Sequence, residues 1–290
     1  MRHKKVESAA ILGIIGNIFL IIIKGIIAFI TNSQAMISDT MNSAGDILSS
    51  FMTYVGNKIA SKEADEDHNL GHGKAEYIFT MLISVVMIIT SVSLVFTSIK
   101  SIFVEYNYNF SYGLLIICVI TFIVKISLYI YTHKIAIKYN NLLVEANALD
   151  HRNDCILTAL TFCASIPGYF NITFVDGIIG ALVAIYILIT GIKLFKESFD
   201  ILMDKGISNE TKEEVLKIIE KYPEIKRINH FNSTPVGYQY QISLTIFVDG
   251  NLSTFESHDI ANRLEKDITK LESIYLTIVH VNPIEIKKDS

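Results

Sequence analysis

Residues 77–99 read YIFTMLISVVMIITSVSLVFTSI, and this stretch carries no formal charge. A helix needs about 20 mostly apolar residues to cross the hydrocarbon core of a bilayer. The stretch is therefore long enough and apolar enough to span a membrane. Five further stretches qualify, although two of them also carry polar side chains, so the sequence predicts an all-α bundle of six transmembrane helices. The predicted spans are residues 9–31, 35–60, 77–99, 112–132, 142–165 and 174–195.

Charged residues are unevenly distributed along the chain. The 290 residues are 51% hydrophobic and 19% charged, with a mean hydropathy of +0.41, whereas a soluble domain is normally about 25% charged. Residues 205–290 hold 24 charged side chains among 86 positions, against 30 in the first 204 residues. We therefore predict a membrane domain at residues 1–204 and a water-soluble domain at residues 205–290. The net charge of −4 argues against a nucleic-acid partner, because no excess of basic residues is available to neutralise phosphates.

The distribution of Lys and Arg predicts the orientation in the membrane, because short cytoplasmic loops carry an excess of them. Basic residues cluster in the N-terminal tail, after the second, fourth and sixth predicted spans, and are absent from residues 31–34 and 167–173. Lys100 is the exception. We therefore expect a multi-pass protein of the cell membrane with both termini in the cytoplasm.

The tail has the periodicity of a small α+β domain. Alternating apolar residues indicate strands, and Ser208 is a good N-cap for the first helix. The order helix, strand, strand, helix, strand predicts a ferredoxin-like αββαβ sandwich, with Pro235 and Gly237 in the turn between the first two strands. The predicted elements are a helix from Ser208 to Tyr222, strands at 225–232 and 239–248, a helix at 254–271 and a strand at 275–281.

The second and fifth predicted spans carry polar side chains at steps of three and four, which places them on one helix face. An ionised group at the bilayer centre costs at least about 2.5–3.5 kcal/mol, so the two faces must meet each other or a watery cavity. Converging carboxylates repel unless a proton or a cation lies between them. The sequence therefore predicts an intramembrane cation site, with helix caps or a proton relay as alternatives. The polar residues are Asp39, Asn42, Ser43, Asp46, Ser50 and Thr53 in the second span and Asn147, Asp150, Asp154, Thr158 and Thr161 in the fifth.

Other charges within the spans are expected to have simpler roles. Lys24 and Lys125 lie in the inner halves of their spans and are predicted to extend to the cytoplasmic surface. Asp176 is predicted to cap the sixth span, and Asp39 is either a cap or part of the site.

Six spans, polar faces on the second and fifth, the sequence DHNLGHGKAE at residues 67–76 and a ferredoxin-like tail together resemble the cation diffusion facilitator family. The resemblance covers almost the whole chain. In that family an i,i+4 pair on the second span and another on the fifth bind the transported metal. The resemblance therefore implies a transport site made of Asn42, Asp46, Asp150 and Asp154.

Two of these positions depart from the zinc-transporting members, which carry Asp or His at the first position and His at the third. The neighbouring His151 is expected to point away, because one residue turns a helix by about 100°. Carboxylate and carbonyl oxygens suit Mn²⁺, whereas imidazole and thiolate suit zinc, copper and iron. The set resembles the manganese-type subgroup of the family. We therefore predict a Mn²⁺/H⁺ antiporter that removes metal from the cytoplasm by alternating access, with no resident cofactor. The alternatives are a Zn²⁺, Fe²⁺ or Co²⁺ exporter of the same family, or a non-transporting membrane metal sensor.

The resemblance implies two further metal positions. One lies in the loop after the second span, where an ordinary solvated acidic loop is the alternative, and consists of Asp65, His68 and His72. The other lies in the tail and consists of His230, His258 and His280. In the tail Ser243 and Asn282 stand where two further ligands are expected, so a binuclear zinc site is doubtful and ordinary histidines are the alternative.

Three further expectations concern structure and partners. Lys74 and Asp204 match a salt bridge of the family between the loop and the end of the sixth span. The chain is expected to form a homodimer through its cytoplasmic domain and membrane helices, surrounded by lipid. It has no HExxH motif and no Ser–His pair within the spans, so an enzyme is not expected.

Overall fold

The computed structural model describes residues 2–31, 34–103, 112–169 and 174–284. The chain divides into two compact units. The first comprises Met1–Lys62 and Ala75–Phe199, and the second comprises Glu63–Lys74 and Asp200–Ser290. The loop that carries the predicted second metal position therefore belongs to the same unit as the tail.

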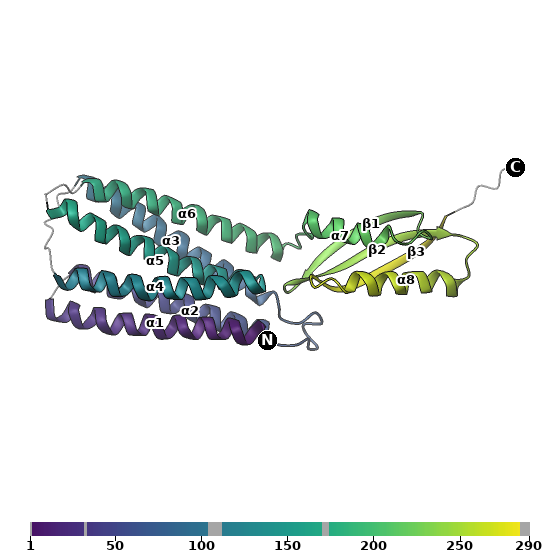
Figure 1. Cartoon of the computed structure of the whole chain (residues 1–290), viewed down its shortest axis with the longest axis horizontal. Helices are drawn as coiled ribbons and strands as arrows, with labels where there is room; N and C mark the ends of the chain where they lie inside the picture. The colour runs from purple at the N-terminus through teal and green to yellow at the C-terminus, as the bar shows by residue number, and fades with distance from the viewer. Residues whose placement is uncertain (1, 32–33, 104–111, 170–173, 285–290) are drawn as a thin grey trace. The chain divides into compact units, whose positions relative to one another are not determined.

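The first unit consists, in its described part, of six long helices that run alongside one another (Figure 1). Each predicted span falls within one of them. Three described stretches are long and apolar enough to cross a membrane: Arg2–Ile26, Ala75–Lys100 and Ile116–Tyr139. Membrane crossing by the other three helices stays a prediction. The helices are α1 (Arg2–Thr31), α2 (Gln34–Ala60), α3 (Ala75–Phe103), α4 (Tyr112–Tyr139), α5 (Leu142–Tyr169) and α6 (Phe174–Leu202).

Close packing brings α2 against its neighbours. A Cβ atom added to Gly56 of α2 would lie 2.8 Å from Phe79 of α3 and 2.9 Å from Leu143 of α5. The absence of a side chain at this position therefore allows three helices to approach one another. The most extensive helix pairs are α1 with α2 and α4 with α5.

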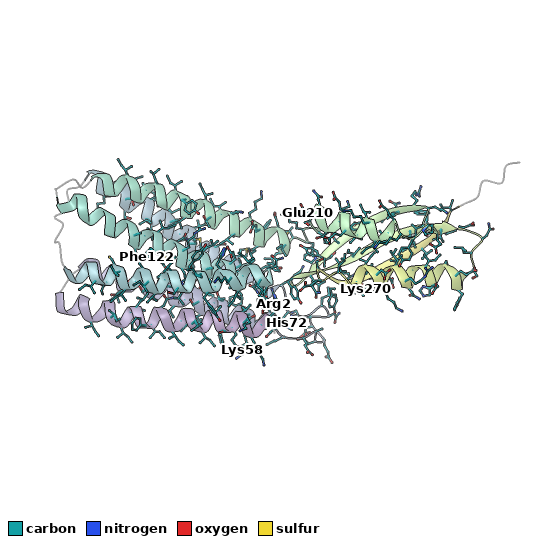
Figure 2. The ribbon with its side chains drawn as sticks, viewed as in Figure 1. Arg2, Lys58, His72, Phe122, Glu210 and Lys270 are labelled. Carbon is teal, nitrogen blue, oxygen red and sulfur yellow. The ribbon has the colours of Figure 1, made fainter. Side chains whose placement is uncertain are left out.

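An ion pair ties the first residues of α1 to the start of α3. The guanidinium of Arg2, labelled in Figure 2, donates to both carboxylate oxygens of Glu76, at 2.5 and 2.7 Å. Its Nε also donates to the carbonyl of Tyr139 at the end of α4, at 3.3 Å. The two charged side chains are only 11% and 3% exposed, so this bidentate pair is largely removed from water and fixes three helix ends together.

The second unit contains a three-stranded sheet with two helices. The order α7, β1, β2, α8, β3 follows the predicted order of elements. The strands β1 and β2 are antiparallel neighbours, and β3 pairs in parallel with β2 after the crossover through α8. The core lies between sheet and helices, with Ile242, Ile246, Leu264 and Val215 fully buried. The bounds are α7 (Asn209–Ile219), β1 (Arg227–Val236), β2 (Gln239–Asp249), α8 (Thr254–Thr269) and β3 (Ile274–Ile284).

Capping residues define the helix starts in this unit. Ser208 caps α7 as predicted, because its hydroxyl accepts from the Thr211 amide at 3.2 Å. Ser253 and Glu256 form a reciprocal capping box at the start of α8. The prediction that Pro235 lies in the turn was wrong: it lies in β1 opposite Tyr240. Because β1 is an edge strand, a residue without an amide hydrogen is tolerated there.

Candidate metal-binding sites

The polar faces of α2 and α5 meet inside the helix bundle. The Ser50 hydroxyl donates to Asn147 Oδ1 at 3.1 Å, and both side chains are fully buried. One residue earlier on α2, the Ser49 hydroxyl donates to the Asp150 carboxylate. These two contacts fix the register between the helices and hold the Asp150 side chain toward α2.

Two further carboxylates converge on one ammonium group. Lys125 of α4 donates to Asp46 of α2 and to Asp154 of α5, and both Nζ–Oδ2 distances are 2.6 Å. The Lys125 side chain is 1% exposed, and each carboxylate side chain is 14% exposed. Three helices therefore contribute one charge each to a shared, largely buried ion cluster.

The prediction that Lys125 extends to the cytoplasmic surface was wrong. A lysine leaves the interior of a bundle when nothing there offers it a partner. Here two carboxylates are within hydrogen-bonding distance, so the ammonium stays inside. Lys24 of α1 is buried as well, and its Nζ donates to Ser43 Oγ of α2 at 3.0 Å.

The side chains of Asp46, Asp150 and Asp154, the carboxylate cluster, lie close enough to act on one another electrostatically. These are three of the four residues that the resemblance implies for transport. Asn42 lies on α2, but its side chain is outside the described residues, as are those of Asp39 and Asp176. The candidate ligand atoms of these three side chains are carboxylate oxygens, which suit hard divalent cations.

His151 adds no nitrogen to the carboxylate cluster. It is 1% exposed, and its ring faces α1, since a Cβ added to Gly13 would lie 3.4 Å from His151 Nε2 and 2.7 Å from Ser50 Oγ. Among the described residues neither ring nitrogen has a hydrogen-bond partner. The side chain therefore points away from the carboxylates, as the helix geometry predicts.

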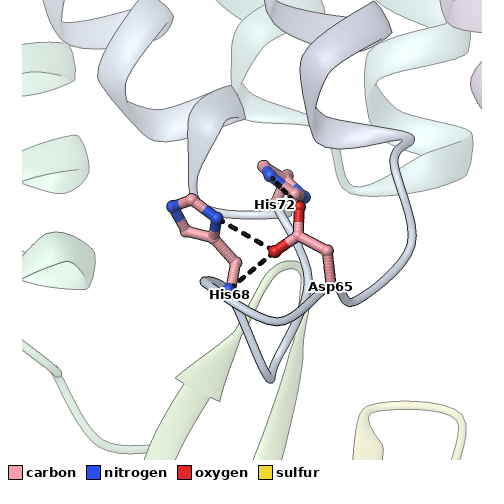
Figure 3. A group of neighbouring side chains, drawn as sticks. All are labelled: Asp65, His68 and His72. Carbon is pink, nitrogen blue, oxygen red and sulfur yellow. Dashed lines mark hydrogen bonds and ion pairs between the residues drawn. The ribbon is translucent and has the colours of Figure 1, made fainter.

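The loop of the second unit brings Asp65, His68 and His72, here called the loop trio, around one point (Figure 3). One ligand atom from each residue lies within 4.8 Å of the others. Asp65 Oδ1 is 3.3 Å from His68 Nδ1, and Asp65 Oδ2 is 3.4 Å from His72 Nε2. Two imidazoles and a carboxylate at these separations can bind a divalent cation.

Hydrogen bonds to the backbone hold Asp65 and His72 of the loop trio in place. The His68 amide donates to the Asp65 carboxylate at 2.7 Å, which lowers the pKa of that carboxyl and keeps it ionised. His72 Nδ1 lies 3.2 Å from the carbonyl of Glu63. A hydrogen bond to that carbonyl needs the proton on Nδ1, so Nε2, which faces Asp65, is the ring atom that a cation would bind.

Two glycines place this loop against the β1–β2 turn. A Cβ on Gly73 would lie 2.6 Å from the Gly237 Cα, and Gly237 itself has a φ of +60°, a conformation that favours glycine. Beside them Lys74 Nζ bonds Asp204 Oδ1 at 2.7 Å. The GHGK sequence therefore positions the loop through close backbone contact and one partly exposed ion pair.

The tail histidines do not form a comparable group within one chain. Among the described residues, the group of three whose ligand atoms all lie within 4.8 Å of one another is the loop trio, and no tail histidine belongs to it. His230 lies in the bulge of β1 with a φ of +48°, and His280 Nε2 is 3.0 Å from Asn282 Oδ1. His258 lies on α8. Metal binding by the tail histidines stays a prediction.

Two residues that contact the carboxylate cluster were missed by the sequence predictions. Ser49 was not counted on the polar face of the second span, although it lies three residues from Asp46. Lys125 was assigned to the surface, although an ionisable residue inside an apolar span is itself a signal of function.

The chain matches two family models and several known proteins. Residues 10–203 match the family model of the cation efflux transmembrane domain, and residues 207–284 match that of the cation efflux protein cytoplasmic domain. The chain is 28% identical over 290 residues to the manganese efflux system protein MneP of Bacillus subtilis, covering 97% of each chain. It is 28% identical over 284 residues to the manganese efflux system protein MneS of the same organism, covering 98% of each. It is also 25% identical over 264 residues to the magnetosome protein MamM of Magnetospirillum gryphiswaldense, covering 89% of this chain and 83% of that one.

Proposed function

We propose that this chain, which belongs to the cation efflux family of membrane transporters, exports a divalent metal cation from the cytoplasm and that Mn²⁺ is its preferred substrate. The proposal includes six membrane spans, both termini in the cytoplasm, and alternating access driven by exchange for protons. It also includes a homodimer formed through the cytoplasmic domain, which matches the cytoplasmic domain of the family, and through the membrane helices.

The observation that carries the proposal is the carboxylate cluster between α2 and α5. Asp46 and Asp154 come from different helices, yet an oxygen of each lies 2.6 Å from the Nζ atom of Lys125. Carboxylates gathered in a bundle interior repel one another unless a positive charge lies among them. A site that gathers them at this cost is suited to a divalent cation, with the fourth ligand expected from Asn42.

The choice of Mn²⁺ rests on the ligand type. Nitrogen and sulfur ligands favour zinc over manganese, whereas oxygen ligands remove most of that advantage. The carboxylate cluster offers oxygen, and the imidazole of His151, which follows Asp150 in the sequence, faces α1. Two of the relatives are named as manganese efflux systems, which supports the same choice.

Proton exchange follows from the charge balance of such a site. When a divalent cation leaves three carboxylates, other positive charge must replace it before the empty site can be closed off from water. Protons bind carboxylates directly, and metal binding releases them again. We therefore expect the carboxylate cluster to carry the exchanged protons. The loop trio is proposed as a separate cation site that does not take part in this exchange.

Flux measurements on the full chain in vesicles test the proposal. Purified protein is reconstituted with a metal-sensitive dye inside, and Mn²⁺ or Zn²⁺ is added outside with and without a pH gradient. Wild-type protein is expected to move Mn²⁺ faster than Zn²⁺ and to respond to the gradient. Asp154→Asn, which keeps the shape of the side chain but removes its charge, is expected to abolish flux.

The matched control is Asp259→Asn, which removes an exposed carboxylate from α8 and is expected to leave flux unchanged. Binding of Mn²⁺ without flux in wild-type protein would favour the non-transporting sensor. Faster movement of Zn²⁺ than of Mn²⁺ would reject the choice of metal and leave the exporter in place.

A further inference from the structure

The ammonium of Lys125 occupies the point where the transported metal is expected to bind. It lies 2.6 Å from an oxygen of Asp46 and 2.6 Å from an oxygen of Asp154, and the side chain is 1% exposed. A divalent cation of this type binds carboxylate oxygens at about 2.0–2.2 Å. A metal bound to the same two oxygens therefore cannot coexist with the ammonium in its present place.

A purely structural role explains this lysine less well. Burying an ammonium is expensive, and replacing a buried ion pair by apolar side chains is often neutral or stabilising. Other side chains could hold α2, α4 and α5 together without using the carboxylates that the transported metal needs.

We propose that Lys125 is a tethered competitor of the transported cation. This inference rests on the proposed function. In the metal-free carrier the ammonium binds Asp46 and Asp154, and an arriving metal displaces it on its flexible four-carbon stem. The lysine thereby weakens metal binding enough for release, and it supplies one of the positive charges with which the empty carrier returns, beside the exchanged protons.

The test compares Lys125→Met, which keeps the length of the side chain without its charge, with Lys125→Arg, which keeps the charge. Three quantities are measured on the full chain: Mn²⁺ affinity, net Mn²⁺ flux into vesicles, and exchange of radiolabelled Mn²⁺ against unlabelled Mn²⁺. Exchange needs only the metal-loaded carrier to reorient, whereas net flux also needs the empty carrier to return.

Lys125→Met is expected to bind Mn²⁺ at least about tenfold more tightly, to lose net flux by about tenfold and to retain exchange. Lys125→Arg is expected to bind no more tightly than wild type. The control Lys193→Met, which removes an exposed ammonium from α6, is expected to change affinity by less than about twofold. Unchanged or weaker binding by Lys125→Met, or net flux equal to that of wild type, would overturn the inference.

A measurement on the wild-type protein covers the case in which Lys125→Met does not fold. Lys125 is labelled with a small membrane-permeant acylating reagent and quantified by mass spectrometry. Added Mn²⁺ is expected to increase labelling of Lys125 relative to the exposed Lys193 of α6, because the ammonium leaves the two carboxylates. Labelling that does not respond to Mn²⁺ would reject displacement.

If wild-type protein moves no metal, the proposed function fails and this inference fails with it. If wild type transports while Lys125→Met behaves identically, this inference alone fails.

Discussion

Asp150→His tests most directly whether oxygen ligands determine the choice of metal. The Asp150 carboxylate accepts a hydrogen bond from Ser49 of α2 and lies within electrostatic reach of the other two members of the carboxylate cluster. The substitution exchanges one oxygen ligand for an imidazole nitrogen and removes one negative charge. His151 does not already supply that nitrogen, because its ring faces α1.

The magnitude follows from two opposing effects. Two unit charges 4 Å apart interact by about 4 kcal/mol at an effective dielectric constant of 20, so losing one carboxylate weakens the binding of every divalent cation, although solvation offsets much of this. The imidazole restores binding for Zn²⁺ far more than for Mn²⁺. A net difference of about 1.4 kcal/mol is a factor of ten, so we expect the ratio of Zn²⁺ to Mn²⁺ flux to rise at least about tenfold.

The assay is competition between equal concentrations of Mn²⁺ and Zn²⁺ in vesicles that contain the full chain. Ser49→Ala serves as the control, because it removes the hydrogen bond to Asp150 and leaves the oxygen ligand in place. The control is expected to slow both metals without changing their ratio. A ratio in Asp150→His within about twofold of the wild-type ratio would refute the reasoning from ligand type.

Three further predictions concern the framework around the sites. Glu76→Gln removes the carboxylate that pairs with the largely buried Arg2 guanidinium, so we expect a loss of about 3–5 kcal/mol, visible as a lower unfolding temperature, and recovery of most of it when both residues are replaced by Met. Gly73→Ala places a Cβ 2.6 Å from the Gly237 Cα, so the loop must shift and calorimetry should detect cation binding by the loop trio weakened by about tenfold. The Tyr222 hydroxyl donates to a carboxylate of α8 at 2.7 Å, and burial together with that bond raises its pKa to about 12. Tyr222→Phe should therefore cost about 1 kcal/mol at neutral pH, and because the raised pKa favours the neutral phenol, this difference should disappear as the pH rises from about 10 to about 12.

Local patterns were sufficient for much of the fold. Long apolar runs locate the helices, because the requirement for backbone hydrogen bonding inside a bilayer leaves few other structures. Ser208 marks a helix start because its hydroxyl accepts a hydrogen bond from an amide only three residues further along the chain. The place of Pro235 could not be predicted in this way, because only the order of strands in the sheet determines that β1 lies at an edge.

The positive charge beside the carboxylate cluster could not be predicted from the sequence, because it depends on how three helices pack together. Periodicity places Asp46 and Asp154 on the polar faces of α2 and α5, and their repulsion requires a cation, but neither argument identifies α4 as its source. Either water at the membrane surface or the two carboxylates could stabilise the Lys125 ammonium. The packing of α4 against α5 determines that the carboxylates are within reach. This bears on the proposed transport, since the Lys125 ammonium offsets part of the negative charge of the carboxylates. A divalent cation must then bind Asp46 and Asp154 more strongly than an ammonium that never leaves the protein, and this sets a lower limit on the metal concentration at which the site fills.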